Sequence, residues 1–113
     1  MKGYKPSSSF LIPLKLLIPH EEKINGVVKK DFEEGDIIFA SFKTYGGTET
    51  TKNGIYSIID TAVIETWFRP DIKSNYRIMT ESGAIYEIIN EPENINMRNQ
   101  YLKFKVQRVK GGA

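Results

Sequence analysis

The 113-residue sequence contains no cysteine and a single histidine. The lack of cysteine excludes a disulfide framework, a thiolate metal site and a cysteine nucleophile, and it is typical of intracellular proteins. His20 stands beside Glu21 and Glu22 without a second histidine to complete a zinc site, so we expect a surface residue. Gly46-Gly47 is not followed by the Gly-Lys-Ser/Thr that cradles phosphates. We therefore expect no enzyme, no metal and no cofactor.

Long apolar runs are also absent. The longest, Phe10 to Ile18, is interrupted by Pro13 and Lys15, is too short to cross a bilayer and lacks the cleavage site of a signal peptide. A hydrophobic content of 40% and a charged content of 27% are average for soluble globular chains. We expect a single domain at residues 10–110, a flexible arm at 1–9, a loose end at 111–113 and no membrane partner.

Neither sign of charge dominates, because 16 basic residues nearly balance 14 acidic ones. The distribution is uneven. The segment after Arg98 contains bases and no acid, whereas five acids lie between Asp71 and Glu93. Two patches of opposite sign could attract each other between copies of the chain. An ordinary solvated strand face that happens to be basic is the alternative.

The sequence is rich in two-residue alternation, the pattern of half-buried strands. In the last such segment Leu102, Phe104 and Val106 point one way, while Lys103 and Lys105 point the other. Expected strands cover residues 10–18, 36–45, 61–69, 76–80, 84–90 and 102–106, the later ones pairing in sequence, and 55–59 fits either a helical turn or a strand. The inward set of the third strand is Ala62, Ile64, Thr66 and Phe68. The fold class is all-β, a small antiparallel β-barrel of about six strands, with a sandwich as the alternative.

Two polar stretches separate these strands. Pro19 to Gly35 is expected to be a loop or a minor hairpin with a turn at Asn25-Gly26. Gly46 to Gly54 has no hydrophobic residue, which predicts a long exposed loop between the second and third strands. Pro13 cannot donate to a ladder, so the first strand should lie at an edge or a bulge.

Several apolar side chains fall on faces expected to point outward, where other subunits would cover them. The expected subunit interface comprises Leu11, Leu17, Phe39, Trp67, Lys103 and Lys105. The same surface supports an alternative function. Outward aromatic side chains beside lysines are typical of barrels that bind single-stranded nucleic acid, although a net charge of +2 is low for a dedicated binder. Candidate stacking residues are Phe39, Tyr45, Trp67 and Tyr101.

Four segments in order carry a resemblance to a known family. They are I-E-T-W-F-R-P-D-I at 64–72, Y-R-I-M at 76–79, G-A-I-Y-E-I-I-N at 83–90 and L-K-F-K-V at 102–106. This order resembles the head–tail joining family of tailed bacteriophages, the head-closure or stopper proteins of siphophage-type connectors. The resemblance covers about residues 36–109. The arm before Phe10 departs from the family, whose members often begin close to their first strand.

The resemblance implies a structural virion protein that assembles in the host cytoplasm into a homo-oligomeric ring, six- or twelve-fold, in the neck of the particle. Such a ring lies beneath the portal and adaptor proteins and above the tail-completion or tail-tube proteins, and packaged double-stranded DNA passes through its channel. In the family, the loop between the second and third strands closes this channel and retains the genome. The matching gate residues are Gly46, Gly47, Thr48, Glu49, Thr50, Thr51, Lys52, Asn53 and Gly54.

Overall fold

The computed structural model describes residues 5–6, 8–52 and 55–109, with the backbone alone for 46–52 and 55–59. Its strands are β1 (Ile12–Ile24), β2 (Val27–Lys52), β3 (Ile55–Trp67), β4 (Arg77–Met79), β5 (Ile85–Ile88), β6 (Glu93–Asn94) and β7 (Tyr101–Arg108). A single 3-10 turn, η1 (Ile95–Met97), is the helical element of these ranges. The part of the chain described contains no helix that is long and apolar enough to cross a membrane.

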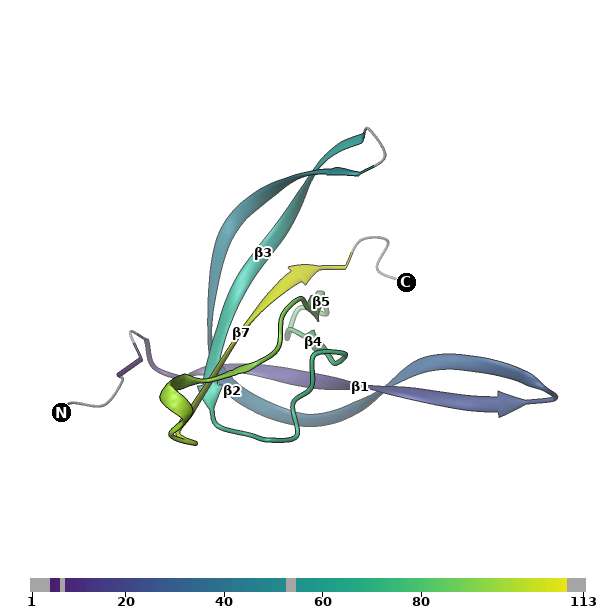
Figure 1. Ribbon diagram of the computed structural model, residues 1–113, viewed down its shortest axis with the longest axis horizontal. Coiled ribbons are helices and arrows are strands. Elements are labelled where there is room, and N and C mark those ends of the chain that lie inside the picture. The colour runs from purple at the N-terminus through teal and green to yellow at the C-terminus, as the bar shows by residue number, and fades with distance from the viewer. Residues whose placement is uncertain (1–4, 7, 53–54, 110–113) are drawn as a thin grey trace.

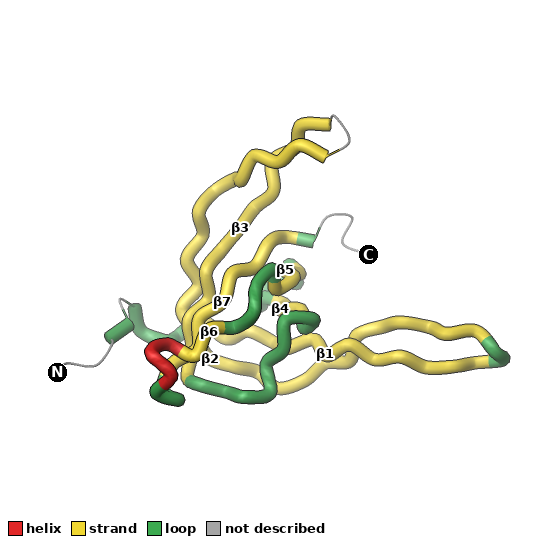
Figure 2. Tube along the Cα trace, in the orientation of Figure 1, coloured by secondary structure: helices red, strands yellow, loops and turns green. Residues whose placement is uncertain are grey.

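The strands form one antiparallel sheet that closes on itself. Their order is β3-β2-β1-β4-β5-β7-β6, and an additional pairing of β3 with β7 completes the circuit (Figures 1 and 2). Six strands therefore make the barrel wall, and the two-residue β6 is added to β7 outside the circuit. The all-β barrel predicted from the sequence is confirmed.

The order of pairing differs from a simple meander. β3 pairs with β7, from Thr61↔Gln107 to Trp67↔Tyr101, and not with β4. β4 instead pairs with β1 and with β5. The physical reason is closure of the barrel, because both edges of every wall strand must be hydrogen-bonded. β3 and β7 stand at the two ends of the row of wall strands, so the sheet closes by pairing them.

Alternation along β2, β3 and β7 places the core where the sequence predicts it. The wall residues with at most 5% exposure are Leu14, Leu16, Ile38, Ala40, Ala62, Ile64, Thr66, Ile78, Leu102, Phe104 and Val106. The one polar member is satisfied, since the Thr66 hydroxyl donates to the Phe39 carbonyl at 2.7 Å. The other faces of β2 and β3 carry exposed Phe39 and Trp67, as expected.

Leu17 lies on the outer face of β1, as expected, but it does not form a subunit surface, because it is only 7% exposed in the single chain. Its face of the sheet is covered by the chain itself. Phe32 lies two rungs further along that face, because Leu17 pairs with Glu34 and Pro19 pairs with Phe32. The guanidinium of Arg77, the β4 partner of Leu17, lies 4.5 Å from the Phe32 ring centre. A small satellite core therefore forms outside the barrel wall.

Two bulges in β2 shape the molecule. Leu16 of β1 faces both Gly35 and Asp36, and Thr61 of β3 faces both Tyr45 and Gly46, because the registers shift by one residue at these points. An extra residue in one strand bends and twists the pair locally. Beyond each bulge two strands leave the barrel as a two-stranded ribbon, and the two ribbons point in different directions (Figure 1).

The stretch at 19–35, expected as a loop or a minor hairpin, is a long hairpin, and the stretch at 46–54, expected as a loop, is strand as far as Lys52. The β1–β2 ribbon pairs as far as Ile24↔Val27 and turns at Asn25-Gly26, whose positive φ values of 52° and 81° suit a two-residue hairpin. The β2–β3 ribbon pairs as far as Lys52↔Ile55, so the segment after Ile55 is strand and not a helical turn. These ribbons give a radius of gyration of 15.7 Å, against about 13 Å for a compact chain of this length.

Candidate functional site

The single histidine lies on the stem of the β1–β2 ribbon. His20 is exposed, and its Nδ1 lies 3.2 Å from Glu33 Oε1 in a surface pair. Among the residues described, no three His, Asp or Glu side chains are arranged to hold a metal ion. The candidate sites are therefore surfaces.

Arg69 forms an ion-pair corner in the W-F-R-P-D-I segment. Its Nε and Nη2 donate to the two carboxylate oxygens of Asp71 at 3.0 and 2.7 Å, and Nη2 also donates to Asp36 Oδ2 at 2.9 Å. These hydrogen bonds from Arg69 lower the pKa of Asp71, and the bond to Asp71 raises the pKa of Arg69. The next residue, Ile72, is buried in the core. The corner ties the β3–β4 connection to β2, so its role is structural.

An aromatic cluster lies at one end of the barrel and consists of Phe10, Trp67 and Tyr101. The register Trp67↔Tyr101 puts these two rings on one face, where they stack with centres 5.5 Å apart. Phe10 meets them edge-on at 5.1 and 6.0 Å. Phe10 thus anchors the N-terminal arm to the barrel. Trp67 remains 60% exposed.

This cluster forms one wall of a pocket, which we call the aromatic pocket. Its volume is about 360 Å³, and Pro6, Ser8 and Ser9 of the arm complete the lining. The pocket is open to solvent, and it combines the three aromatic rings with two serines of the arm. It is the kind of concave, aromatic-lined surface that receives an apolar side chain of a partner.

Three of the expected interface residues come together beside this cluster. Ala40 of β2 pairs with Thr66 of β3, and both side chains point into the core. The residues next to them, Phe39 and Trp67, therefore face outward on adjacent strands, and on its other side Phe39 pairs with Pro13 of β1. Leu11, at 76% exposed, precedes the first rung of β1 at the same end of the sheet. Leu17 is separate from this group and buried, as described above.

One of the two interface lysines lies between acids of its own chain. Lys103 is directly opposite Glu65 of β3 and Glu93 of β6. Lys105 is opposite Val63, and the two lysines line a groove of about 550 Å³ with Val63, Tyr45 and Ile89. Cross-strand neighbours of opposite charge stabilise a sheet by about 0.2–1 kcal/mol. Of the two alternatives for the basic segment after Arg98, this arrangement favours an ordinary solvated strand face over a separate basic patch.

The tip of the β1–β2 ribbon is a feature that the sequence analysis missed. Ile24, Val27 and Val28 are 47%, 66% and 55% exposed, at the end of a ribbon whose stem is charged. Ion pairs such as Glu21 with Lys30 cross the stem. The signal was present, because apolar residues flank Asn25-Gly26, the dipeptide most typical of a two-residue hairpin.

The expected gate residues fall on the other ribbon. Gly46 to Lys52 form the end of β2 and, from Gly47 on, pair with β3, while Asn53 and Gly54 lie outside the described residues. The predicted free loop is thus a paired ribbon as far as Lys52. Threonine is β-branched and favours strands, which gives the physical reason in a segment with three of them.

No family model matches the sequence, and no curated protein matches it either. Solved structures do share its fold. A chain from the virion of a native gene transfer agent particle superposes with a TM-score of 0.68 at 14% identity, covering 86% of this chain and 93% of that chain. The solution structure of protein SF1141 from Shigella flexneri 2a gives a TM-score of 0.67 at 16% identity, covering 90% and 95%. At these identities the likeness shows the fold, which both proteins share over nearly their whole length.

Proposed function

We propose that this chain is a structural protein of a phage-like virion and forms the head-closure ring of its connector. The observation that carries the proposal is the fold match to a chain of a gene transfer agent virion, which spans 93% of that chain. The four segments that resemble the head–tail joining family agree with it. Their residues supply the β3–β7 wall, the Arg69–Asp71 corner and the β4–β5 hairpin.

The surfaces of the barrel support a subunit of an assembly. Leu11, Phe39 and Trp67 expose large apolar side chains at one end, as surfaces that other subunits cover do. Portal or adaptor proteins above the ring and tail proteins below it are the proposed partners of these surfaces.

The β2–β3 ribbon is the proposed gate. Its paired part runs over six rungs from Gly47↔Asp60 to Lys52↔Ile55, about 20 Å at strand spacing. Backbone pairing keeps such a ribbon extended, so in a ring it can reach from the wall into the channel. Copies from several subunits would then obstruct the passage and retain the packaged DNA.

The position of the chain in the particle tests the proposal. Filled particles from cells whose genome encodes this chain are purified, and the neck is reconstructed by electron microscopy. The proposal expects a ring of these barrels between the portal or adaptor and the tail. Filled particles that lack the chain, or that hold it in the tail tube or capsid shell, would refute it.

Single-stranded nucleic-acid binding is the second candidate, and one observation favours it. Exposed Trp67 stacks on Tyr101, and Lys103 lies two residues further along β7. Stacking platforms beside positive charge bind bases without sequence preference. The acids opposite Lys103 weaken this candidate, because they reduce the positive potential that the phosphates need.

A further inference from the structure

The tip of the β1–β2 ribbon exposes apolar side chains where hairpin tips are normally polar. Ile24 pairs with Val27 on one face, and Val28 pairs with Lys23 on the other, so both faces of the tip carry an aliphatic side chain. In the stem, four consecutive positions on β1, 20–23, and three on β2, 29–31, are histidine or charged. The apolar character is thus confined to the tip, which suits insertion into a pocket better than packing on a flat surface.

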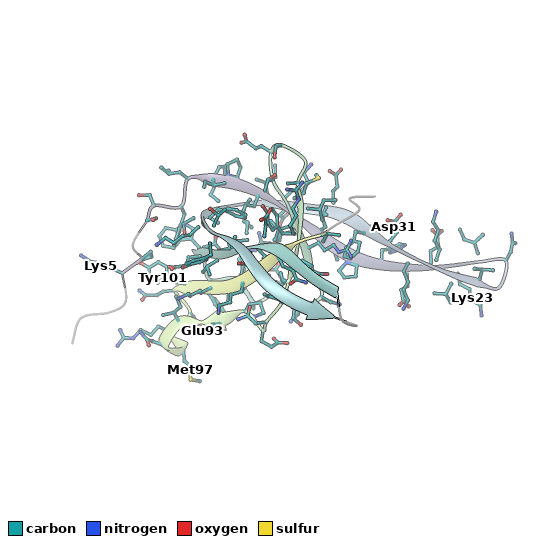
Figure 3. All side chains as sticks on the ribbon, turned by 90° about the horizontal axis from the view of Figure 1, so that it is seen from above. Lys5, Lys23, Asp31, Glu93, Met97 and Tyr101 are labelled. Carbon is teal, nitrogen blue, oxygen red and sulfur yellow. The ribbon has the colours of Figure 1, made fainter. Side chains whose placement is uncertain are left out.

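The aromatic pocket of the same chain lies at the opposite end of the molecule. Figure 3 shows Lys23 near the ribbon tip and Tyr101 and Lys5 at the far end of the long axis. The molecule is 56 Å long along that axis. The tip therefore cannot reach its own pocket, and an occupant must come from another molecule.

We propose that the ribbon tip of one copy inserts into the aromatic pocket of the next copy. Ile24, Val27 and Val28 would then cover the exposed face of Trp67 and the arm residues around it. The two surfaces differ, so the contact is head to tail and repeats from copy to copy, as the subunits of a ring require. This inference deepens the proposed ring and rests on it.

Charge favours a second copy as the partner. Residues 20–34 contain five acids and three lysines, so this segment carries −2, and the rest of the chain must carry +4 to give the total of +2. A negative ribbon approaching a positive body is attracted, whereas two ribbons or two bodies repel each other. The end that holds the pocket also carries exposed Lys5, next to Pro6 of the lining.

The size of the contact predicts a weak pairwise affinity. Three aliphatic side chains in a pocket of about 360 Å³ bury far less than the roughly 800 Å² per partner of a stable interface. Copies should be monomeric when dilute and should associate when they are concentrated or when a neighbouring ring aligns them.

Disulfide trapping tests the contact, since the chain has no cysteine of its own. We would introduce Val27→Cys at the tip and Ser9→Cys in the pocket of one full-length chain, and oxidise it at about 1 mM. We expect a ladder of dimers, trimers and larger species on a non-reducing gel. The matched control combines Ser9→Cys with Lys30→Cys on the exposed stem, and it should cross-link about tenfold more slowly because only random encounters join it.

A second measurement uses the native sequence. Trp67 is the single tryptophan, and tip insertion would bury it, so its emission should shift to the blue as the wild-type chain is concentrated. Val27→Asp should abolish this shift and leave the circular dichroism spectrum unchanged. Equal cross-linking rates in the two cysteine pairs, or a Trp67 spectrum independent of concentration, would overturn the inference. Because both readouts use the purified chain, they can fail while the neck reconstruction still supports the head-closure role.

Discussion

Replacing Leu17 and Leu11 by alanine in turn measures which of the two supports the fold of the isolated chain. Leu17 is 7% exposed in the satellite core with Phe32 and Arg77, whereas Leu11 is 76% exposed. Buried Leu→Ala changes cost about 2–5 kcal/mol, and a satellite site that can partly collapse should lie near 2–3 kcal/mol. Leu11→Ala should stay within about 0.5 kcal/mol of wild type.

The assays are thermal and urea unfolding followed by far-UV circular dichroism, because exposed Trp67 makes fluorescence a poor reporter of the core. With about 0.24 kcal/mol per degree for 113 residues, Leu17→Ala should lower Tm by roughly 8–12 °C. The urea dependence should keep its slope, since the same surface is exposed on unfolding. Equal stability of the two variants, or a larger loss in Leu11→Ala, would refute the assignment of Leu17 to a satellite core.

Three further predictions address the gate, the ion-pair corner and the alternative function. Deleting Thr48–Asn53 should give assembled particles that lose their DNA to nuclease, whereas particles with the length-preserving control Glu49→Gln/Lys52→Gln should retain their DNA. If particles with the deletion also retained their DNA, the β2–β3 ribbon would not be the gate. Asp71→Asn should cost at most about 0.5 kcal/mol, because the Asp71 side chain is 54% exposed. The pKa of Asp71 is lowered in the fold. The stabilisation by the Arg69–Asp71 pair should therefore be complete above the ordinary aspartate pKa of about 3.9 and should vanish as the pH falls through the folded-state pKa. A cost of Asp71→Asn that persists in acid would contradict the pairing. Titration of short single-stranded DNA at increasing salt should show no micromolar binding, and steep salt-dependent binding would favour the nucleic-acid alternative.

The two ribbons connect the fold to the proposed assembly. A two-stranded ribbon is marginally stable alone, so each must be supported where it leaves the barrel. The β1–β2 ribbon has such support at its base, where Arg77 lies over Phe32 and Lys15 pairs with Glu34 at 2.8 Å. Cross-strand pairs such as Glu21 with Lys30 hold its outer part, so contact with a partner would stabilise it further.

Local alternation predicted most of the barrel wall. In β3 and β7 every second residue from Ala62 to Thr66 and from Leu102 to Val106 is buried, because a strand with one face in the core must repeat every two residues. The Glu81-Ser82-Gly83 turn was also predictable, since Gly83 has a φ of 89° that other residues rarely adopt.

The glycines of β2 carried a signal that was misread. The sequence pattern predicts loop boundaries at Gly35 and Gly46, yet each lies at a bulge inside one continuous strand. A glycine within a strand often marks a bulge or a close approach, and a Cβ at Gly35 would come within 2.8 Å of Ile18 Cδ1. Reading them as bulges would have lengthened β2 in both directions and predicted the two ribbons.

The sequence by itself determined that this chain is a small all-β domain, and it determined which face of most strands is buried, because both follow from side-chain periodicity over a few residues. Only the tertiary structure decided that β3 pairs with β7, that Leu17 is buried and that Phe10, Trp67 and Tyr101 meet in one pocket. Those features depend on which strand edges remain free when the sheet closes. That condition involves residues far apart in the chain, and no local pattern encodes it.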